Sequence, residues 1–158
     1  LPVATVRTTQ APPVTVPGID KPVVVVTGEI TGNETWTSAN YYVLRGAVFV
    51  RNAATLNIGA GTRVIGESGS VGTLIVEQGG RLNAIGTATA PVVFTSDQAP
   101  GTRGRGDWGG LIINGRAPVN LIGGQGAGEG DTGERAGLDE TEVEGTELRG
   151  VRSHRDSD

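Results

Sequence analysis

A short cassette that recurs along the chain constrains its fold more than any other feature of the sequence. Residues 47–66 read AVFVRNAATLNIGAGTRVIG, residues 73–96 read TLIVEQGGRLNAIGTATAPVVFTS, and residues 107–120 read DWGGLIINGRAPVN. Each copy opens with an apolar run of strand-forming residues and then reaches a small polar or glycine corner. In the first two copies a short Leu-Asn strand follows the corner. Such a unit buries its apolar side by stacking on its neighbours, which predicts a β-solenoid.

The spacing of the copies sets the length of one coil. Residues 49–50 and 56–57 align with residues 75–76 and 82–83 at an offset of 26, and residues 62–65 align with residues 91–94 at an offset of 29. Three short strands in a coil of this length predict an all-β, three-sided parallel β-helix. We expect three to five coils over residues 23–122, with the first strands at 23–30 and 41–44.

The two ends of the chain differ in composition from this core. Residues 1–22 contain five prolines, which favour extended backbone and predict an arm or linker that docks on the solenoid or on another protein. Residues 123–158 hold 10 of the 17 acidic residues and begin rich in glycine, which predicts an acidic loop and terminal segment. The early aromatic residues Trp36, Tyr41 and Tyr42 are expected to cap the open end of the first coil.

Composition excludes several classes of function. The chain has no cysteine, which excludes disulfides, thiolate zinc sites and a cysteine nucleophile. No basic run is present, so nucleic acid is not an expected partner. The longest aliphatic run is Val23–Val26, far too short to span a membrane. The sequence does not begin with methionine, and we expect a processed precursor whose export signal has been removed.

Several residues in the cassettes are predicted to have structural roles. The two Leu-Asn strands align their asparagines, which predicts an amide ladder between coils. Arg51 and Glu77 are expected to pair if they lie on neighbouring coils. Asp107 follows Arg105 and Gly106 in an integrin-type tripeptide, but the adjoining Trp-Gly-Gly favours a structural corner. The residues assigned a structural role are Asn57, Asn83, Asp107, Trp108, Gly109 and Gly110.

Candidates for chemistry are few. Asp131, Glu134, Asp139 and Glu140 offer oxygen ligands for calcium, but their spacing matches neither an EF-hand loop nor a tandem GGxGxDxUx repeat, and a solvated acidic loop is the alternative. His154 is the only histidine and sits in a charged tail, which argues against a catalytic triad. We therefore expect no catalytic residue and no cofactor.

Three stretches resemble a broad family of secreted bacterial proteins, most of them of unknown function. They are Ala54–Gly66, Leu74–Ser96 and Pro100–Asn120, which include the blocks GTATAPVVFTS and RGDWGG. The resemblance implies a right-handed, single-stranded parallel β-helix located outside the cytoplasm, in the periplasm or at the cell surface. It brings no agreed catalytic residues.

These observations favour a non-catalytic structural or interaction protein over an enzyme. We expect an accessory scaffold subunit docked on the outer face of a membrane-protein complex or of the cell envelope, anchored by residues 1–22. One alternative is a free, adhesin-like surface module. The other is a carbohydrate-binding or polysaccharide-degrading β-helix protein, which requires an exposed acidic and aromatic groove.

Overall fold

The computed structural model describes residues 20–115 in full, together with the backbone of short strands at 7–10, 126–127, 135–136, 147–149 and 151–153. Regular structure in these residues is almost entirely β. The exception is a single 3₁₀ turn, η1 (Ser68–Ser70). The described residues form no helix with the length and apolar character needed to cross a bilayer.

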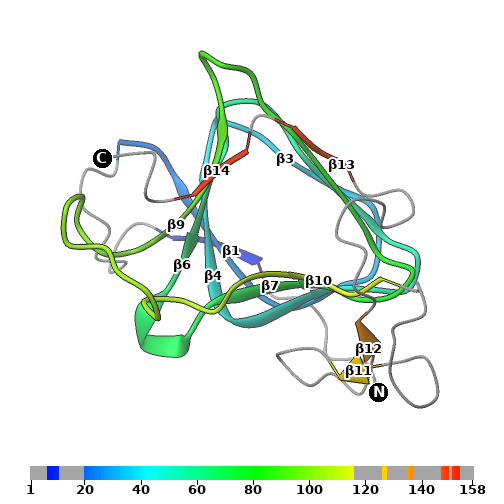
Figure 1. Ribbon diagram of the computed structural model, residues 1–158. Coiled ribbons are helices and arrows are strands. Elements are labelled where there is room, and N and C mark those ends of the chain that lie inside the picture. The colour runs from blue at the N-terminus through cyan, green and yellow to red at the C-terminus, as the bar shows by residue number, and fades with distance from the viewer. Residues whose placement is uncertain are drawn as a thin grey trace.

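The strands stack in parallel to form a three-sided solenoid. Figure 1 looks along the stack and shows the three faces as the sides of a triangle. The β7 face contains residues 28–30 and 47–50, β7 (Thr73–Val76) and β10 (Gly110–Ile113). The β5 face contains β3 (Glu34–Trp36), β5 (Thr55–Ile58), β8 (Arg81–Ile85) and β13 (Glu147–Arg149). The β6 face contains residues 23–26 and 41–44, β6 (Arg63–Gly66), β9 (Val92–Ser96) and β14 (Val151–Ser153).

The corner between the β6 and β7 faces grows longer from coil to coil. β2 (Val23–Ile30) and β4 (Tyr41–Val50) turn this corner without a break, at Gly28 and Gly46, whose φ angles are 72° and 65°. Positive φ is open to glycine at little energetic cost. In the third coil the corner is residues 67–72, which include η1, and in the fourth it is residues 97–109. Figure 1 shows both segments projecting at the lower left of the triangle.

The register follows the repeat seen in the sequence, with one correction. Phe49 pairs with Ile75 and Leu56 pairs with Leu82, so the offset of 26 is confirmed. The expected offset of 29 between β6 and β9 is wrong, because Val64 pairs with Phe94 at an offset of 30. A slip of one residue would place an inward side chain beside an outward one, and this register keeps Val64 and Phe94 in the same core.

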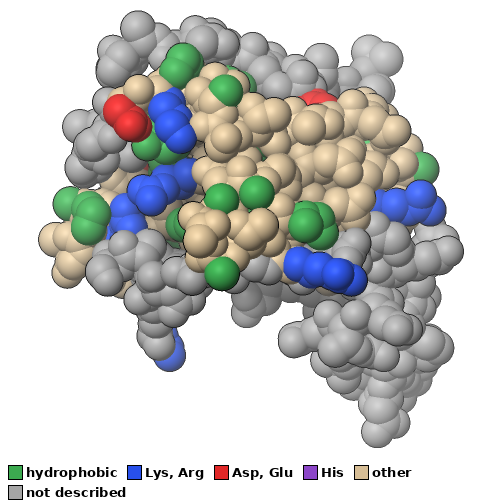
Figure 2. Space-filling model, turned by 90° about the horizontal axis from the view of Figure 1, so that it is seen from above, with side chains coloured by type: hydrophobic (Ala, Val, Ile, Leu, Met, Phe, Trp, Pro, Cys, Tyr) green, Lys and Arg blue, Asp and Glu red, His purple; other side chains and the backbone are tan. Residues whose placement is uncertain are grey.

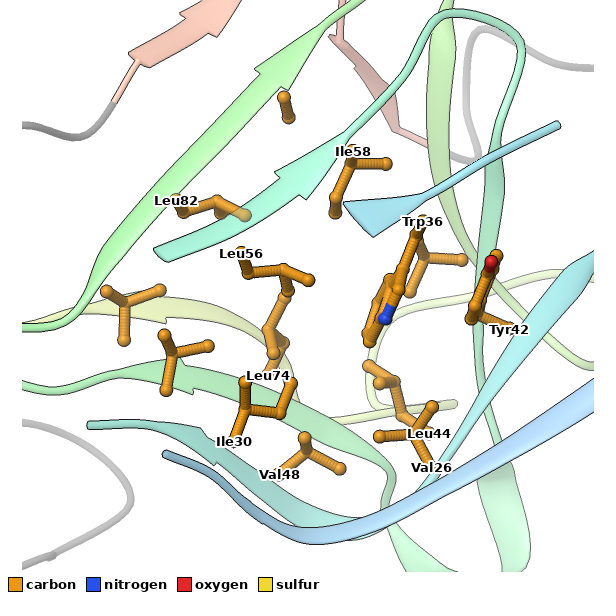
Figure 3. Close-up of a cluster of buried hydrophobic side chains, with 14 of the residues drawn as sticks. Val26, Ile30, Trp36, Tyr42, Leu44, Val48, Leu56, Ile58, Leu74 and Leu82 are labelled. Carbon is orange, nitrogen blue, oxygen red and sulfur yellow. The ribbon is translucent and has the colours of Figure 1, made fainter. Parts of the chain in front are cut away.

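The interior is an apolar core to which all three faces contribute. Figure 3 shows these side chains pointing toward one another from opposite walls. Complete burial of a valine, leucine or isoleucine side chain stabilises the fold by about 1.5–3 kcal/mol relative to leaving it exposed. Seven of the large side chains in this core are at most 2% exposed: Ile30, Trp36, Leu44, Leu56, Ile58, Leu74 and Leu82.

Trp36 and Tyr42, two of the aromatic residues expected at the open end of the first coil, lie inside the core rather than along the edge of β2. Trp36 and Tyr42 are 2% and 6% exposed, and their rings stack with centroids 4.6 Å apart. Both occupy inward positions of their strands, so burial of their large apolar surface places them in the core. The edge of β2 is instead paired with β1 (Arg7–Gln10), which runs antiparallel to it.

The all-β, parallel β-helix fold class is confirmed, and its strands continue beyond residue 122. β13 and β14 come from the C-terminal segment and add in parallel to β8 and β9. Four strands stack on the β5 face, which lies within the expected three to five coils. A separate antiparallel pair joins β11 (Gly126–Ala127) to β12 (Arg135–Ala136).

Candidate functional site

Every carboxylate in residues 20–115 accepts a hydrogen bond from the solenoid itself. This stretch contains seven carboxylates and seven Lys or Arg side chains, so its formal net charge is zero. Asp20, for example, accepts a 2.6 Å bond from the hydroxyl of Tyr41, which lowers the pKa of Asp20 and raises that of Tyr41. The other six carboxylates accept as follows: Glu29 and Glu77 from Arg51, Glu34 from Trp36, Glu67 from Arg45 and Ser70, Asp97 from Gln98, and Asp107 from Ser96 and Gly104.

The most buried charges form a ladder across three coils of the β7 face. Arg51 donates to Glu29 on the coil before it and to Glu77 on the coil after it. The three side chains are 25%, 12% and 6% exposed, respectively. The guanidinium carbon of Arg51 also lies 4.5 Å from the centre of the Phe49 ring, close enough for a cation–π interaction. The ladder therefore places one positive charge between two negative ones, in a site where none of the three side chains is more than 25% exposed.

Asn114 extends this ladder by one rung. Its backbone N–H bonds to Val76, as the N–H of Glu77 bonds to Val50 one coil earlier. The side chain is 3% exposed and its Oδ1 atom has no hydrogen-bond partner. Equivalent positions on three successive coils are therefore occupied by the guanidinium of Arg51, the carboxylate of Glu77 and the amide of Asn114.

A second ion pair links two successive corners of the solenoid. Arg45 bonds both carboxylate oxygens of Glu67, and the hydroxyl of Ser70 donates to the same group at 2.6 Å. The Arg45 guanidinium is the main cause that holds the pKa of Glu67 below 4.5, with Ser70 adding to it and burial opposing it. Ser70 also accepts a 3.0 Å bond from the backbone N–H of Gly46. This pair therefore ties residues 67–72 to the coil before them.

This pair predicts a small loss of stability in acid. Because the folded-state pKa of Glu67 is lowered, its contribution is complete above the unfolded value of 4.5 and is lost as the pH falls through the folded value. Arg45 is 43% exposed, so we expect less than about 1 kcal/mol. The free energy of unfolding, measured in urea at a series of pH values, should fall less steeply toward acidic pH for Glu67→Gln than for wild type. Identical slopes would contradict this role.

The longest corner, residues 97–109, is closed by Asp107. One oxygen of Asp107 accepts bonds from Ser96 at 3.1 Å and from the N–H of Gly104 at 2.8 Å. Arg105 and Gly106 are exposed. The aspartate of the integrin-type tripeptide is thus engaged in holding its own loop rather than projecting from it.

The Trp-Gly-Gly that follows packs closely against the preceding coil. The indole of Trp108 lies against Gly66, where a methyl group would overlap it. A methyl group on Gly109 would overlap the side chain of Thr73, and the N–H of Gly109 bonds to Gly72 at 2.9 Å. Gly110 has a φ of 84° and opens β10.

The β5 face presents a polar outer surface. The amide of Asn83 donates to Asn57 at 3.1 Å, and the amide of Asn57 donates to the carbonyl of Glu34 at 3.4 Å. Asn33 accepts a 2.9 Å bond from the N–H of Thr55 and so completes the edge of β5. Figure 2, seen from above, shows a surface dominated by uncharged polar and backbone atoms, with Lys and Arg toward its margins and few acidic groups.

The described residues contain no cluster of three or more His, Asp or Glu side chains that could hold a metal ion. The calcium candidates Asp131, Glu134, Asp139 and Glu140, and also His154, lie outside the described residues.

Two features of these surfaces were not anticipated from the sequence. Glu29 joins Arg51 and Glu77, although the first coil is shorter than the 26-residue repeat and so breaks the alignment. Aligning residues 23–30 with residues 41–50 on their glycines would not have revealed it, because Gly28 pairs with Val48 rather than with Gly46. Val71 has a left-handed backbone and an exposed side chain, which no sequence pattern signals.

Comparison with known proteins gives one match. A family described as pectate-lyase-like β-helix domains matches residues 28–147, which is more than half of the chain. No curated protein matches, and no solved structure matches.

Proposed function

The chain belongs to the family of pectate-lyase-like β-helix domains, and on that premise we propose that it is a non-catalytic, extracytoplasmic interaction scaffold. The observation that carries this proposal is the engagement of all seven carboxylates in residues 20–115 by donors of the solenoid. Hydrolysis of a glycosidic bond generally uses two carboxylates free to act as acid, base or nucleophile. These carboxylates instead stabilise corners, edges and contacts between coils.

The two arginines that bridge coils support the same proposal. A general base must reach a substrate proton with a free lone pair. Arg51 is held between two carboxylates, and Arg45 is bonded to both oxygens of Glu67. Neither guanidinium is arranged to act on a bound sugar.

A rigid solenoid is well suited to docking, because its faces are long and its loops are held in place by neighbouring coils. We propose that the partner lies on the outer face of a membrane-protein complex or of the cell envelope, and that residues 1–22 serve as the anchor. The antiparallel pairing of β1 with β2 fastens residues 7–10 to the first coil, and we propose that other parts of residues 1–22 contact the partner.

Two measurements test the proposal together. Membranes of the source cell would be solubilised in mild detergent and separated by size, with the chain located by mass spectrometry. Purified protein would be incubated with acidic and neutral polysaccharides, and the release of new reducing ends and of unsaturated products would be followed. We expect co-migration with a large complex and no cleavage. Cleavage of any of these polysaccharides would overturn the proposal.

A second candidate function is the binding of carbohydrate without cleavage, and the polar β5 face favours it. Thr35, Asn57, Arg81 and Asn83 place hydroxyl, amide and guanidinium groups on one outer surface. Retarded migration in gels containing a polysaccharide, reduced by Arg81→Ala, would support this function. An unchanged mobility across acidic and neutral polysaccharides would exclude it for those ligands.

A further inference from the structure

A second apolar cluster lies on the outer side of the β6 face. Val43 alternates along β4 with Tyr42 and Leu44, whose side chains belong to the interior core. It must therefore point away from that core, yet its side chain is fully buried. The register places it in an outward column of four residues, each at most 4% exposed, which we call the outer β6 column: Val25, Val43, Ile65 and Thr95.

Another segment must pack over the outer β6 column. Side chains on the outer side of a sheet meet water unless something covers them. Among the described hydrophobic side chains outside the cluster, Tyr41 packs against it, and Tyr41 is itself only half-buried. The rest of the cover comes from this same chain, because the burial arises within a single copy of it.

Both ends of residues 11–19 are fixed beside this column. Gln10 pairs with Val23, and Val23 in turn pairs with Tyr41. At the other end, Asp20 accepts a 2.6 Å hydrogen bond from the hydroxyl of that same tyrosine. The segment therefore leaves the solenoid and returns to it at one rung of the β6 face, two residues along β2 from the first member of the column.

The length and composition of residues 11–19 fit this position. They read APPVTVPGI, so seven of the nine residues are apolar and three are prolines, which carry no N–H group to be left unpaired on burial. Nine extended residues span about 30 Å, so a loop that runs out and back reaches about 15 Å. Neighbouring strands lie about 4.8 Å apart, so the four strands of the column extend over about 14 Å.

Two other parts of the chain that lie largely outside the described residues fit the column less well. Residues 116–146 leave from β10 on the β7 face and return at β13 on the β5 face, and Figure 1 shows β11 and β12 away from the β6 face. Residues 154–158 read HRDSD and contain no apolar side chain. Residues 1–6 are largely apolar as well, and experiment separates them from residues 11–19.

We propose that residues 11–19 pack over the outer β6 column and form a fixed part of the solenoid. The occupant of this surface is a segment of the same chain rather than a partner protein. The position of the segment does not depend on the proposed scaffold function. Where that function holds, residues 1–6 are the part of the arm left to meet the partner.

Single introduced thiols test the proposal, because the chain has no cysteine of its own. Val43→Cys places a thiol in the outer β6 column, and the matched control Val48→Cys places one in the interior core on the same strand; both valines are 0% exposed. In each variant, residues 11–19 are then replaced by alternating glycine and serine, which keeps the length of the segment and removes its apolar side chains. We expect the reaction of Val43→Cys with a maleimide to become about tenfold faster or more, while Val48→Cys stays protected.

Two results of this labelling would overturn the proposal. One is that Val43→Cys stays as protected as before the replacement. The other is that removing residues 1–6, with residues 11–19 intact, exposes Val43→Cys, because the cover would then be the other part of the arm. Neither result bears on the scaffold function, which is tested by co-migration and by polysaccharide cleavage.

A disulfide in the otherwise intact chain tests the same contact without replacing the segment. Val14→Cys and Val16→Cys are each combined with Val43→Cys, or with Phe49→Cys on the outer side of the β7 face as the control. A disulfide requires Cα atoms within about 7 Å of each other. We expect mild oxidation to join position 43 to one of the two arm positions and to join neither of them to position 49. The absence of any disulfide to position 43 would contradict the proposal.

Discussion

Replacing Gly72 by alanine is expected to destabilise the protein by about 4 kcal/mol or more, which is a large part of the stability of an ordinary domain. A methyl group at this position would overlap the carbonyl oxygen of Leu44 and lie 2.7 Å from the backbone nitrogen of Glu67. Both atoms are backbone atoms, so no side chain can rotate away to make room. Either a coil must shift from its neighbour or the corner must open.

The matched control for this prediction is Gly69→Ala, three residues earlier on the same corner. A methyl group at Gly69 meets nothing within 4 Å, and the residue does not adopt a left-handed backbone. We expect a change within about 0.5 kcal/mol of wild type. Chemical denaturation of both variants measures the difference, and similar stabilities would show that the coils are not packed as described.

Removing Arg51 is expected to have the next largest effect. Arg51→Ala leaves Glu29 and Glu77 facing each other with 12% and 6% exposure and no compensating charge between them. Breaking a buried ion pair by removing one partner typically costs about 3–5 kcal/mol. Loss of the contact with Phe49 adds to this cost.

Arg45→Ala provides the control for Arg51→Ala, because it also removes an arginine that bridges two coils. Arg45 is 43% exposed and Glu67 is 21% exposed, so water solvates both groups after the change. We expect a loss below about 1 kcal/mol. Urea unfolding at neutral pH should therefore rank the variants clearly. Equal losses would mean that the ladder on the β7 face is more solvated than its burial indicates.

The comparison of these two ion pairs bears on the proposed function. The stronger pair lies on a face of the solenoid and spans three coils, whereas the weaker one supports the corner that carries Val71. Variants at Arg51 are therefore unsuitable for testing binding, because their main effect is on folding.

The sequence by itself determined the repeating part of this protein. The strands at 23–30 and 41–44, the 26-residue offset and the asparagine ladder all follow from residues that alternate inward and outward with a period of two. That alternation is local, so it can be read without knowing what each strand packs against. The pairing of Arg51 with Glu77 follows from the same offset.

Only the tertiary structure decided the rest. The 30-residue offset of β9, the burial of Trp36 and Tyr42, and the inclusion of Glu29 in the ladder depend on coils of unequal length. The left-handed Val71 is bonded to Ser68 and Thr73 of its own corner, and the adjacent Gly72 accepts a bond from Gly109 of the next coil. In a solenoid the pattern within one strand is set by its own side chains, but the corners are set by neighbouring coils, whose contacts are distant in sequence.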